Sequence, residues 1–189
     1  MTGGDEQLAP LVRLACHDLR TPLATISGFA KTMVRAGTLP DREARFAGMI
    51  DEAAGQMNEL IARLSLAAAL AAGRHEPYLE EADTLELAEA AAGERVTVEG
   101  RGESVRTDRE LVRQALVALA TAAWRHGQLD TVTWRVDGRE LVLAPVVAHA
   151  VPVLDGSSAK DLGAMVARLA LEAVGARVAL EGDRLLVRL

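Results

Sequence analysis

Two long stretches of apolar residues at helical spacing occupy the first 72 positions and restrict the folds open to this chain. From about Asp5 or Pro10 to Ala36, and again from Asp41 to about Ala72, apolar side chains recur every three or four residues. Residues 37–40, Gly-Thr-Leu-Pro, end the first helix, and Asp41 is a good N-cap for the second. The sequence therefore predicts two antiparallel helices, each roughly 45 Å long at about 1.5 Å per residue. The stripe positions are Leu11, Leu14, Leu19, Leu23, Ile26, Phe29, Ala30 and Met33, then Phe46, Met49, Ile50, Ala53, Met57, Leu60, Ile61 and Leu64.

A hairpin of two such helices cannot hide both apolar stripes from water by itself. Pairing with a second copy of the chain buries them in a four-helix bundle. A homodimer is therefore expected.

Within the first helix, residues 17–22 read His-Asp-Leu-Arg-Thr-Pro and place a nucleophile, an acid and a hydroxyl together. His17 and Thr21 share a helix face because they are four residues apart. Asp18 can accept a hydrogen bond from one ring nitrogen of His17, which leaves the lone pair of the other nitrogen free to attack. Pro22 lacks an N–H, so a kink is expected there. The segment is a candidate nucleophilic site, and His17 is expected on the outward face near the middle of the bundle.

Residues 17–23, followed by Ala-Thr-Ile-Ser-Gly-Phe at 24–29, resemble the phosphoacceptor box of two-component sensor histidine kinases. The resemblance implies that His17 carries a phosphoryl group and that Asp18 assists it as a general base. It also implies that Thr21 orients a water molecule for dephosphorylating a partner. Arg20 is a candidate for steadying phosphate charge, because a guanidinium pairs well with phosphoryl oxygens.

The chain is predicted to have two domains, a helical hairpin at 1–76 and a domain of mixed α and β structure at 77–189. The second domain is similar to a shortened version of the ATP-binding domain that follows the phosphoacceptor bundle in sensor kinases. The predicted fold class is α+β, with a dimeric four-helix bundle followed by a small α/β sandwich. The expected helices are Thr84–Ala92, with the acidic cluster 80–83 at its start, a helix from a capping box at Thr107 to Trp124, and Ser158–Val174. The expected strands are Arg95–Glu99, Thr131–Val136, Arg139–Leu143, Arg177–Glu181 and Arg184–Val187.

The motifs with which sensor kinases bind ATP are altered in this chain. In that family a long helix carries two asparagines four residues apart, and one of them helps to hold magnesium. Ala118 and Ala122 stand in those positions here, and a methyl group offers Mg²⁺ no oxygen ligand. The aspartate that accepts the adenine amino group is replaced by Val146, and two glycines that admit close backbone approach are replaced by Ala148 and Ala150.

The phosphate-loop pattern of the same family aligns best with residues 159–164, where only Gly163 survives. Asp161 places a negative charge at a helix N-terminus that otherwise suits anions. Residues 153–158 are too few to form an ATP lid. The sequence therefore predicts no productive ATP binding, and it assigns no cofactor-binding or metal-binding residues. His126 and His149 are interpreted as surface or packing residues.

An intact phosphoacceptor box beside an altered nucleotide site is similar to the histidine phosphotransferases of bacterial phosphorelays that are built on a kinase-like dimer. The resemblance implies transfer of a phosphoryl group from an aspartate of one receiver domain to His17, and then to an aspartate of another. The partners are then receiver domains of response regulators and of an upstream hybrid kinase. They are expected to dock at Thr21, Thr25 and Gly28, with part of the second helix. The Mg²⁺ is expected to come with the receiver domain.

Two other functions remain open on the sequence. One is an active or partly active sensor histidine kinase or phosphatase core that acts on a response regulator. The other is a non-catalytic dimer that binds a receiver domain.

Charge and cysteine content exclude further classes of partner. The net charge is −6 at pH 7 and no basic stripe suggests a membrane surface, so neither nucleic acid nor a membrane is expected. The alanine-rich run 64–72 is too short to cross a bilayer, and no signal peptide is expected. The single cysteine, Cys16, excludes an internal disulfide and fits a reducing cytoplasm, the expected location.

Overall fold

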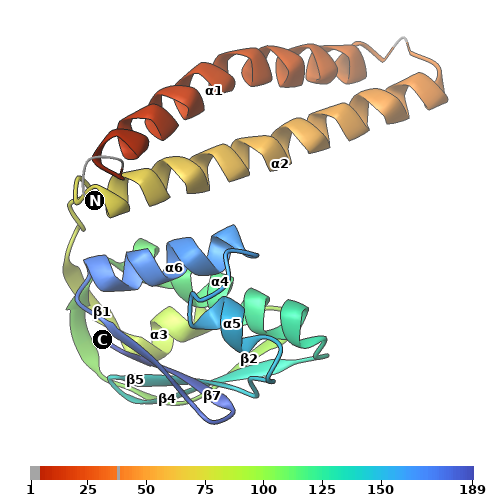
Figure 1. The fold of residues 1–189 in the computed structure, drawn as a ribbon. Helices are drawn as coiled ribbons and strands as arrows, with labels where there is room; N and C mark the ends of the chain where they lie inside the picture. The colour runs from red at the N-terminus through yellow and green to blue at the C-terminus, as the bar shows by residue number, and fades with distance from the viewer. Residues whose placement is uncertain (1–4, 38) are drawn as a thin grey trace. The chain divides into compact units, whose positions relative to one another are not determined.

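A computed structural model describes residues 5–37 and 39–189 of the chain. The chain divides into two compact units, Met1–Ala72 and Gly73–Leu189. The first is a helical hairpin and the second is a mixed α/β unit (Figure 1), in agreement with the predicted α+β class.

The first unit consists of α1 (Asp5–Ala36) and α2 (Asp41–Ala71), which run antiparallel (Figure 1). The residues buried between them lie seven positions apart on each helix, which is the spacing of a coiled-coil seam. Most are small, so the two backbones can approach closely. The seam residues are Cys16, Leu23 and Ala30 on α1, and Ala47, Ala54, Ile61 and Ala68 on α2.

Most of the large apolar side chains of the hairpin remain exposed after α1 and α2 have packed together. Their exposed fractions run from 39% at Leu64 to 68% at Phe29. The predicted apolar stripe therefore has two parts. Leu23, Ala30 and Ile61 are buried in the seam, and the other stripe residues are not. Over the described residues, no helix is long and apolar enough to span a bilayer. The exposed face of the hairpin comprises Leu11, Leu14, Leu19, Ile26, Phe29, Met33 and Val34 of α1 and Phe46, Met49, Ile50, Met57, Leu60 and Leu64 of α2.

The start of α2 differs from the prediction. The N-cap position is Pro40, which has no side-chain hydrogen bond, and Asp41 is the first residue of the helix. Asp41 still lies in the first turn, where its negative charge is favourable at the positive end of the helix dipole. Proline fits here because its fixed φ suits the entry to a helix.

The second unit contains a five-stranded sheet, whose strands lie in the order β2-β4-β5-β7-β6. β2 pairs with β4 in parallel, and the other neighbours are antiparallel. Both predicted hairpins are present, and their turns carry Gly138 and Gly182 at φ +59° and +60°. The strands are β2 (Val96–Gly102), β4 (Val132–Gly138), β5 (Glu140–Ala144), β6 (Arg177–Glu181) and β7 (Arg184–Arg188).

The helices of the second unit cover one face of this sheet (Figure 1). The core lies between the two layers, and its largest fully buried side chain is Trp134 of β4. The long apolar helix predicted to begin near Thr107 is present as α4. The helices are α3 (Thr84–Glu89), α4 (Arg109–Gly127), α5 (Val151–Leu154) and α6 (Leu162–Ala173).

Two elements of this unit differ from the sequence-based expectations. The acidic cluster 80–83 forms strand β1 (Glu80–Asp83), which pairs with β3 (Ser104–Thr107). Its last residue, Asp83, does cap α3, accepting from the backbone N–H groups of Leu85 and Glu86. The last predicted helix, Ser158–Val174, begins only at Leu162 as α6, and the short helix α5 before it was not predicted.

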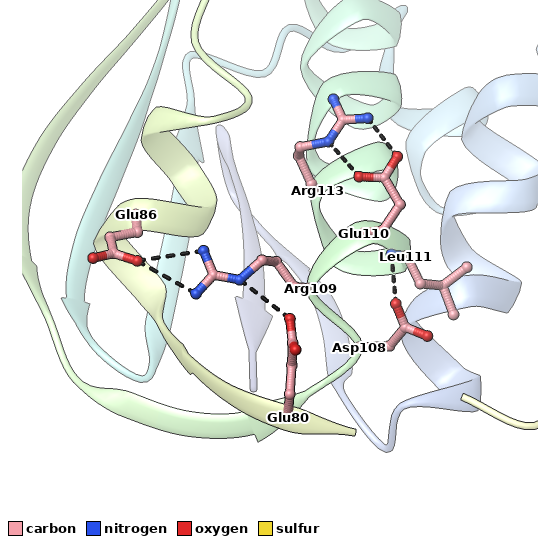
Figure 2. Close-up of polar contacts among 7 residues, drawn as sticks. All are labelled: Glu80, Glu86, Asp108, Arg109, Glu110, Leu111 and Arg113. Atoms are coloured by element: carbon pink, nitrogen blue, oxygen red, sulfur yellow. Dashed lines mark hydrogen bonds and ion pairs between the residues drawn. The ribbon is translucent and has the colours of Figure 1, made fainter. Parts of the chain in front are cut away.

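The capping box expected at Thr107 is displaced by one residue. Asp108 is the N-cap of α4, and its carboxylate accepts from the N–H of Leu111 at 2.9 Å (Figure 2). Arg109 then contacts Glu80 of β1 at 3.4 Å and Glu86 of α3 at 3.4 Å, so one guanidinium joins three elements (Figure 2).

Glu110 lies next to this junction, in the first turn of α4. Its carboxylate accepts hydrogen bonds from Arg113 (Figure 2) and from Gln114, and these bonds lower its pKa to about 2. A negative charge is therefore kept at the positive end of the α4 dipole.

Candidate functional site

His17 projects from the hairpin because of its place next to the seam. Cys16 is 2% exposed and faces α2, and the following residue is turned about 100° around the helix. The His17 side chain is 78% exposed and that of Asp18 is 70% exposed. His17 Nδ1 lies 3.3 Å from Asp18 Oδ1, which leaves Nε2 facing away from the carboxylate. At this distance the carboxylate orients the ring through a long hydrogen bond, since strong charge-assisted bonds are about 2.7–2.9 Å.

α1 continues without a break through Pro22, where a kink was expected. The helix changes direction gradually along its length in Figure 1. Thr25 donates a hydrogen bond from Oγ1 to the carbonyl oxygen of Thr21 at 3.1 Å. Thr21, Thr25 and Gly28 are all exposed on the hairpin. A Cβ on Gly28 would meet nothing within 4 Å, so packing inside this chain does not require glycine at that position.

A row of basic side chains shares the helix face of His17, and the sequence analysis missed it. The residues at 13, 17, 20, 24, 28, 31 and 35 follow one another at spacings of three or four, which places them on one face of α1. Four of them are basic and exposed, and we call them the basic row. The row spans 23 positions, so it cannot be seen as a cluster until the residues are placed on a helix. It consists of Arg13, Arg20, Lys31 and Arg35.

One member of the basic row is also tied to α2. Lys31 lies 3.6 Å from Asp51, which accepts a hydrogen bond from Ser27 at 2.7 Å. This polar contact joins α1 and α2 on the side of the hairpin that carries the basic row.

In the second unit, the residues that replace the kinase nucleotide motifs are mostly packed. Ala122 of α4 and Ala150 are fully buried, and Val146 is 3% exposed. Val146 also donates its backbone N–H to the carbonyl oxygen of Asp183, which holds it against the turn between β6 and β7. The donor set needed by a nucleotide and its magnesium is therefore not present at these positions, where methyl and isopropyl groups supply no polar atoms.

Asp161 and His126 form a hydrogen bond that links α4 to the start of α6 in the second unit. His126 Nε2 lies 2.9 Å from Asp161 Oδ2, and the Asp161 side chain is only 12% exposed. The interpretation of His126 as a surface or packing residue was thus incomplete, because 35 positions separate it from its partner. His149, in contrast, is exposed as expected. Within residues 5–37 and 39–189, no group of three or more His, Cys, Asp or Glu side chains could hold a metal ion.

A comparison with known families finds a match that lies almost entirely in the first unit. Residues 9–73 match the family described as the His Kinase A (phospho-acceptor) domain. This range contains all of α2 and all of α1 from Ala9 onward. No curated protein matches the chain.

Two solved structures are similar in fold to most of this chain. One is full-length ShkA in complex with AMPPNP, with 17% identity and a TM-score of 0.67; the match covers 94% of this chain and 44% of ShkA. The other is the histidine kinase AdeS of Acinetobacter baumannii, with 17% identity and a TM-score of 0.55; it covers 90% of this chain and 94% of the AdeS chain. The chain thus spans less than half of the length of ShkA. At this identity the likeness shows a common fold.

Proposed function

We propose that this chain, which carries a His Kinase A phospho-acceptor domain over residues 9–73, is a histidine phosphotransferase that moves phosphoryl groups between receiver-domain aspartates without ATP. The observation that carries the proposal is the contrast between its two units. His17 is exposed beside Asp18 within the phospho-acceptor domain, whereas the nucleotide motifs of the second unit have lost their polar groups.

The geometry at His17 supports a direct in-line transfer. The Nδ1–H of His17 donates a hydrogen bond to Asp18. In this tautomer the free lone pair of the ring is on Nε2. Nε2 attacks the phosphorus of an aspartyl phosphate on the partner. An N–P bond forms while the bond from phosphorus to the carboxyl oxygen breaks, and the leaving carboxylate keeps the electron pair. Asp18 offsets the positive charge that develops on the ring, and the aspartate of a second receiver reverses the step.

Such a transfer needs little beyond position and charge. Arg20 lies three residues after His17 on the same face, from which its guanidinium can reach phosphoryl oxygens. The Mg²⁺ that neutralises further charge would be supplied by the receiver domain. Thr21, Thr25 and Gly28 would form the surface on which that domain docks, since their short side chains allow a partner helix to approach closely.

A homodimer is part of this proposal. The exposed face of the hairpin is too large and too apolar to remain in water, because a soluble monomer rarely exposes a contiguous apolar patch of more than a few hundred Å². Pairing two hairpins through this face buries it and leaves the basic row and His17 on the outside.

The first test separates the two possible sources of phosphate. The full chain is incubated with radiolabelled ATP and Mg²⁺, and separately with a panel of receiver domains carrying labelled aspartyl phosphate. We expect label on this chain only from a receiver. Label from ATP alone would overturn the claim of ATP independence, and an absence of label from every receiver in the panel would contradict the transferase role.

The basic row predicts that the receiver presents an acidic surface. Receiver pockets that hold Mg²⁺ are rich in carboxylates, and opposite charges accelerate association. We expect the double variant Arg13→Glu/Arg35→Glu to lower the second-order rate of transfer at low salt by about tenfold or more, and to weaken its salt dependence. The rate is measured by rapid quench with limiting receiver.

Arg177→Glu/Arg188→Glu, which makes the same charge change at two exposed positions on β6 and β7, is the matched control. Circular dichroism establishes that the helices of Arg13→Glu/Arg35→Glu remain intact. If both variants slowed transfer equally, net charge and not the basic row would govern the encounter.

A further inference from the structure

The start of α6 is held by a carboxylate from the chain itself. Asp161 is the N-cap of this helix of 12 residues, and its Oδ1 accepts from the backbone N–H of Ala164 at 3.1 Å. A helix N-terminus carries unsatisfied N–H groups and a positive dipole end, so it attracts anions. An ordinary cap of this kind needs only one carboxylate oxygen.

The second oxygen of Asp161 is bound by a different helix. Oδ2 lies 2.9 Å from His126 Nε2 and 3.9 Å from a guanidinium nitrogen of Arg125, both in the last turn of α4. The carboxylate is therefore surrounded by an imidazole, a guanidinium and a helix dipole. Burial raises the pKa of Asp161, but hydrogen bonds from His126 and Ala164 and the charge of Arg125 outweigh it and leave the pKa below its ordinary value.

The residues next to Asp161 are small enough to let this contact form. A Cβ added to Gly163 would lie 3.1 Å from Asp161 Oδ1 and 3.6 Å from the Cβ of Ala118. A side chain at 163 would therefore crowd the carboxylate, whereas its distance from Ala118 of α4 is an ordinary packing contact. Ala118, which replaces a polar residue of the kinase motif, lies against the same first turn of α6.

We propose that the Asp161 carboxylate is an internal anion that occupies the anion-binding end of α6, and that this contact takes the place of a bound ligand in fixing α6 against α4. The contact closes the helix terminus to phosphate groups from solution. It explains how this unit keeps its helices in place although its nucleotide motifs have lost their donors. The inference is independent of the transfer reaction at His17.

Chemical rescue tests this proposal. In the full chain, Asp161→Ala removes the carboxylate and leaves the N–H groups of α6, His126 and Arg125 facing a gap of that size. We expect the variant to melt at a lower temperature than the wild type, by several degrees. Sodium formate is expected to raise the melting temperature of the variant above its value in sodium chloride at the same ionic strength, because formate can occupy the gap. Inorganic phosphate is expected to stabilise the variant but not the wild type.

Asp108→Ala is the matched control. Asp108 also caps a long helix, but its oxygens accept from the backbone N–H groups of Leu111 and Tyr78 and it has no cationic partner among the described residues. The proposal is supported if formate rescues Asp161→Ala but not Asp108→Ala. The rescue of Asp161→Ala should also become smaller when His126 is replaced by alanine. Equal rescue of both caps, no rescue, or equal phosphate stabilisation of the wild type would each overturn it. Label transfer to His17, measured on the same samples, reports separately on the proposed function.

Discussion

Replacing His17 with glutamine is expected to abolish label uptake from a phosphorylated receiver, by at least about a thousandfold. Glutamine keeps a similar size and polarity but has no nitrogen lone pair of comparable nucleophilicity. Because the His17 side chain is 78% exposed and does not enter the seam, the substitution should leave the stability of the hairpin almost unchanged. The measurement is single-turnover transfer of label from receiver to chain.

His149→Gln serves as the control for this experiment, since His149 is an exposed histidine of the second unit. It should accept label at the wild-type rate through His17. The label on the wild type should be lost in acid and survive alkali, as expected for a phosphorus–nitrogen bond. If His17→Gln were labelled as fully as the wild type, another residue would be the phosphoryl acceptor, and the proposed function would lose its basis.

Placing a charge on the exposed apolar face is expected to dissociate the proposed homodimer. Ile26 is 48% exposed and belongs to the part of that face on α1. In Ile26→Glu each copy loses an apolar contact and carries an unpaired carboxylate into the interface, which costs several kcal/mol. A total of about 4 kcal/mol raises the dissociation constant of the dimer by about a thousandfold. Sedimentation equilibrium measures the change.

Thr32→Glu adds the same charge to α1 at an exposed position that is not one of these apolar residues, and the Thr32 hydroxyl donates to the carbonyl oxygen of Gly28. This variant should dimerise like the wild type. If Ile26→Glu and the wild type had the same mass in solution, the apolar face would require another occupant.

The accuracy of the sequence-based predictions depended on whether each signal was local. The hairpin, the strand pairs around Gly138 and Gly182 and the apolar stretch of α4 follow from periodicity and turn residues, which are short-range patterns. The boundaries were less accurate. A cap is decided by geometry within a single turn, so Asp108 and Pro40 took the places assigned to Thr107 and Asp41.

Strands β1 and β3 could not be inferred from their own residues. Glu80–Asp83 is acidic and polar, which is typical of a solvated segment, and it becomes a strand only by pairing with Ser104–Thr107, over 20 positions later. The same limit applies to His126, whose partner Asp161 is remote in the chain. Interactions of this kind depend on tertiary packing and leave no periodic signal.

By itself, the sequence determined the chemistry of the candidate site. The order His-Asp-Leu-Arg-Thr-Pro fixes a ring nitrogen, an acid and a guanidinium within two helical turns, because backbone hydrogen bonds set their spacing. Only the tertiary structure decided which apolar residues form the seam, and hence which face carries His17. Burial of Cys16 and Leu23 against α2 turns His17 outward and aligns it with the basic row. Local bonds specify which groups are neighbours, whereas the direction in which they point is set by what the helix packs against.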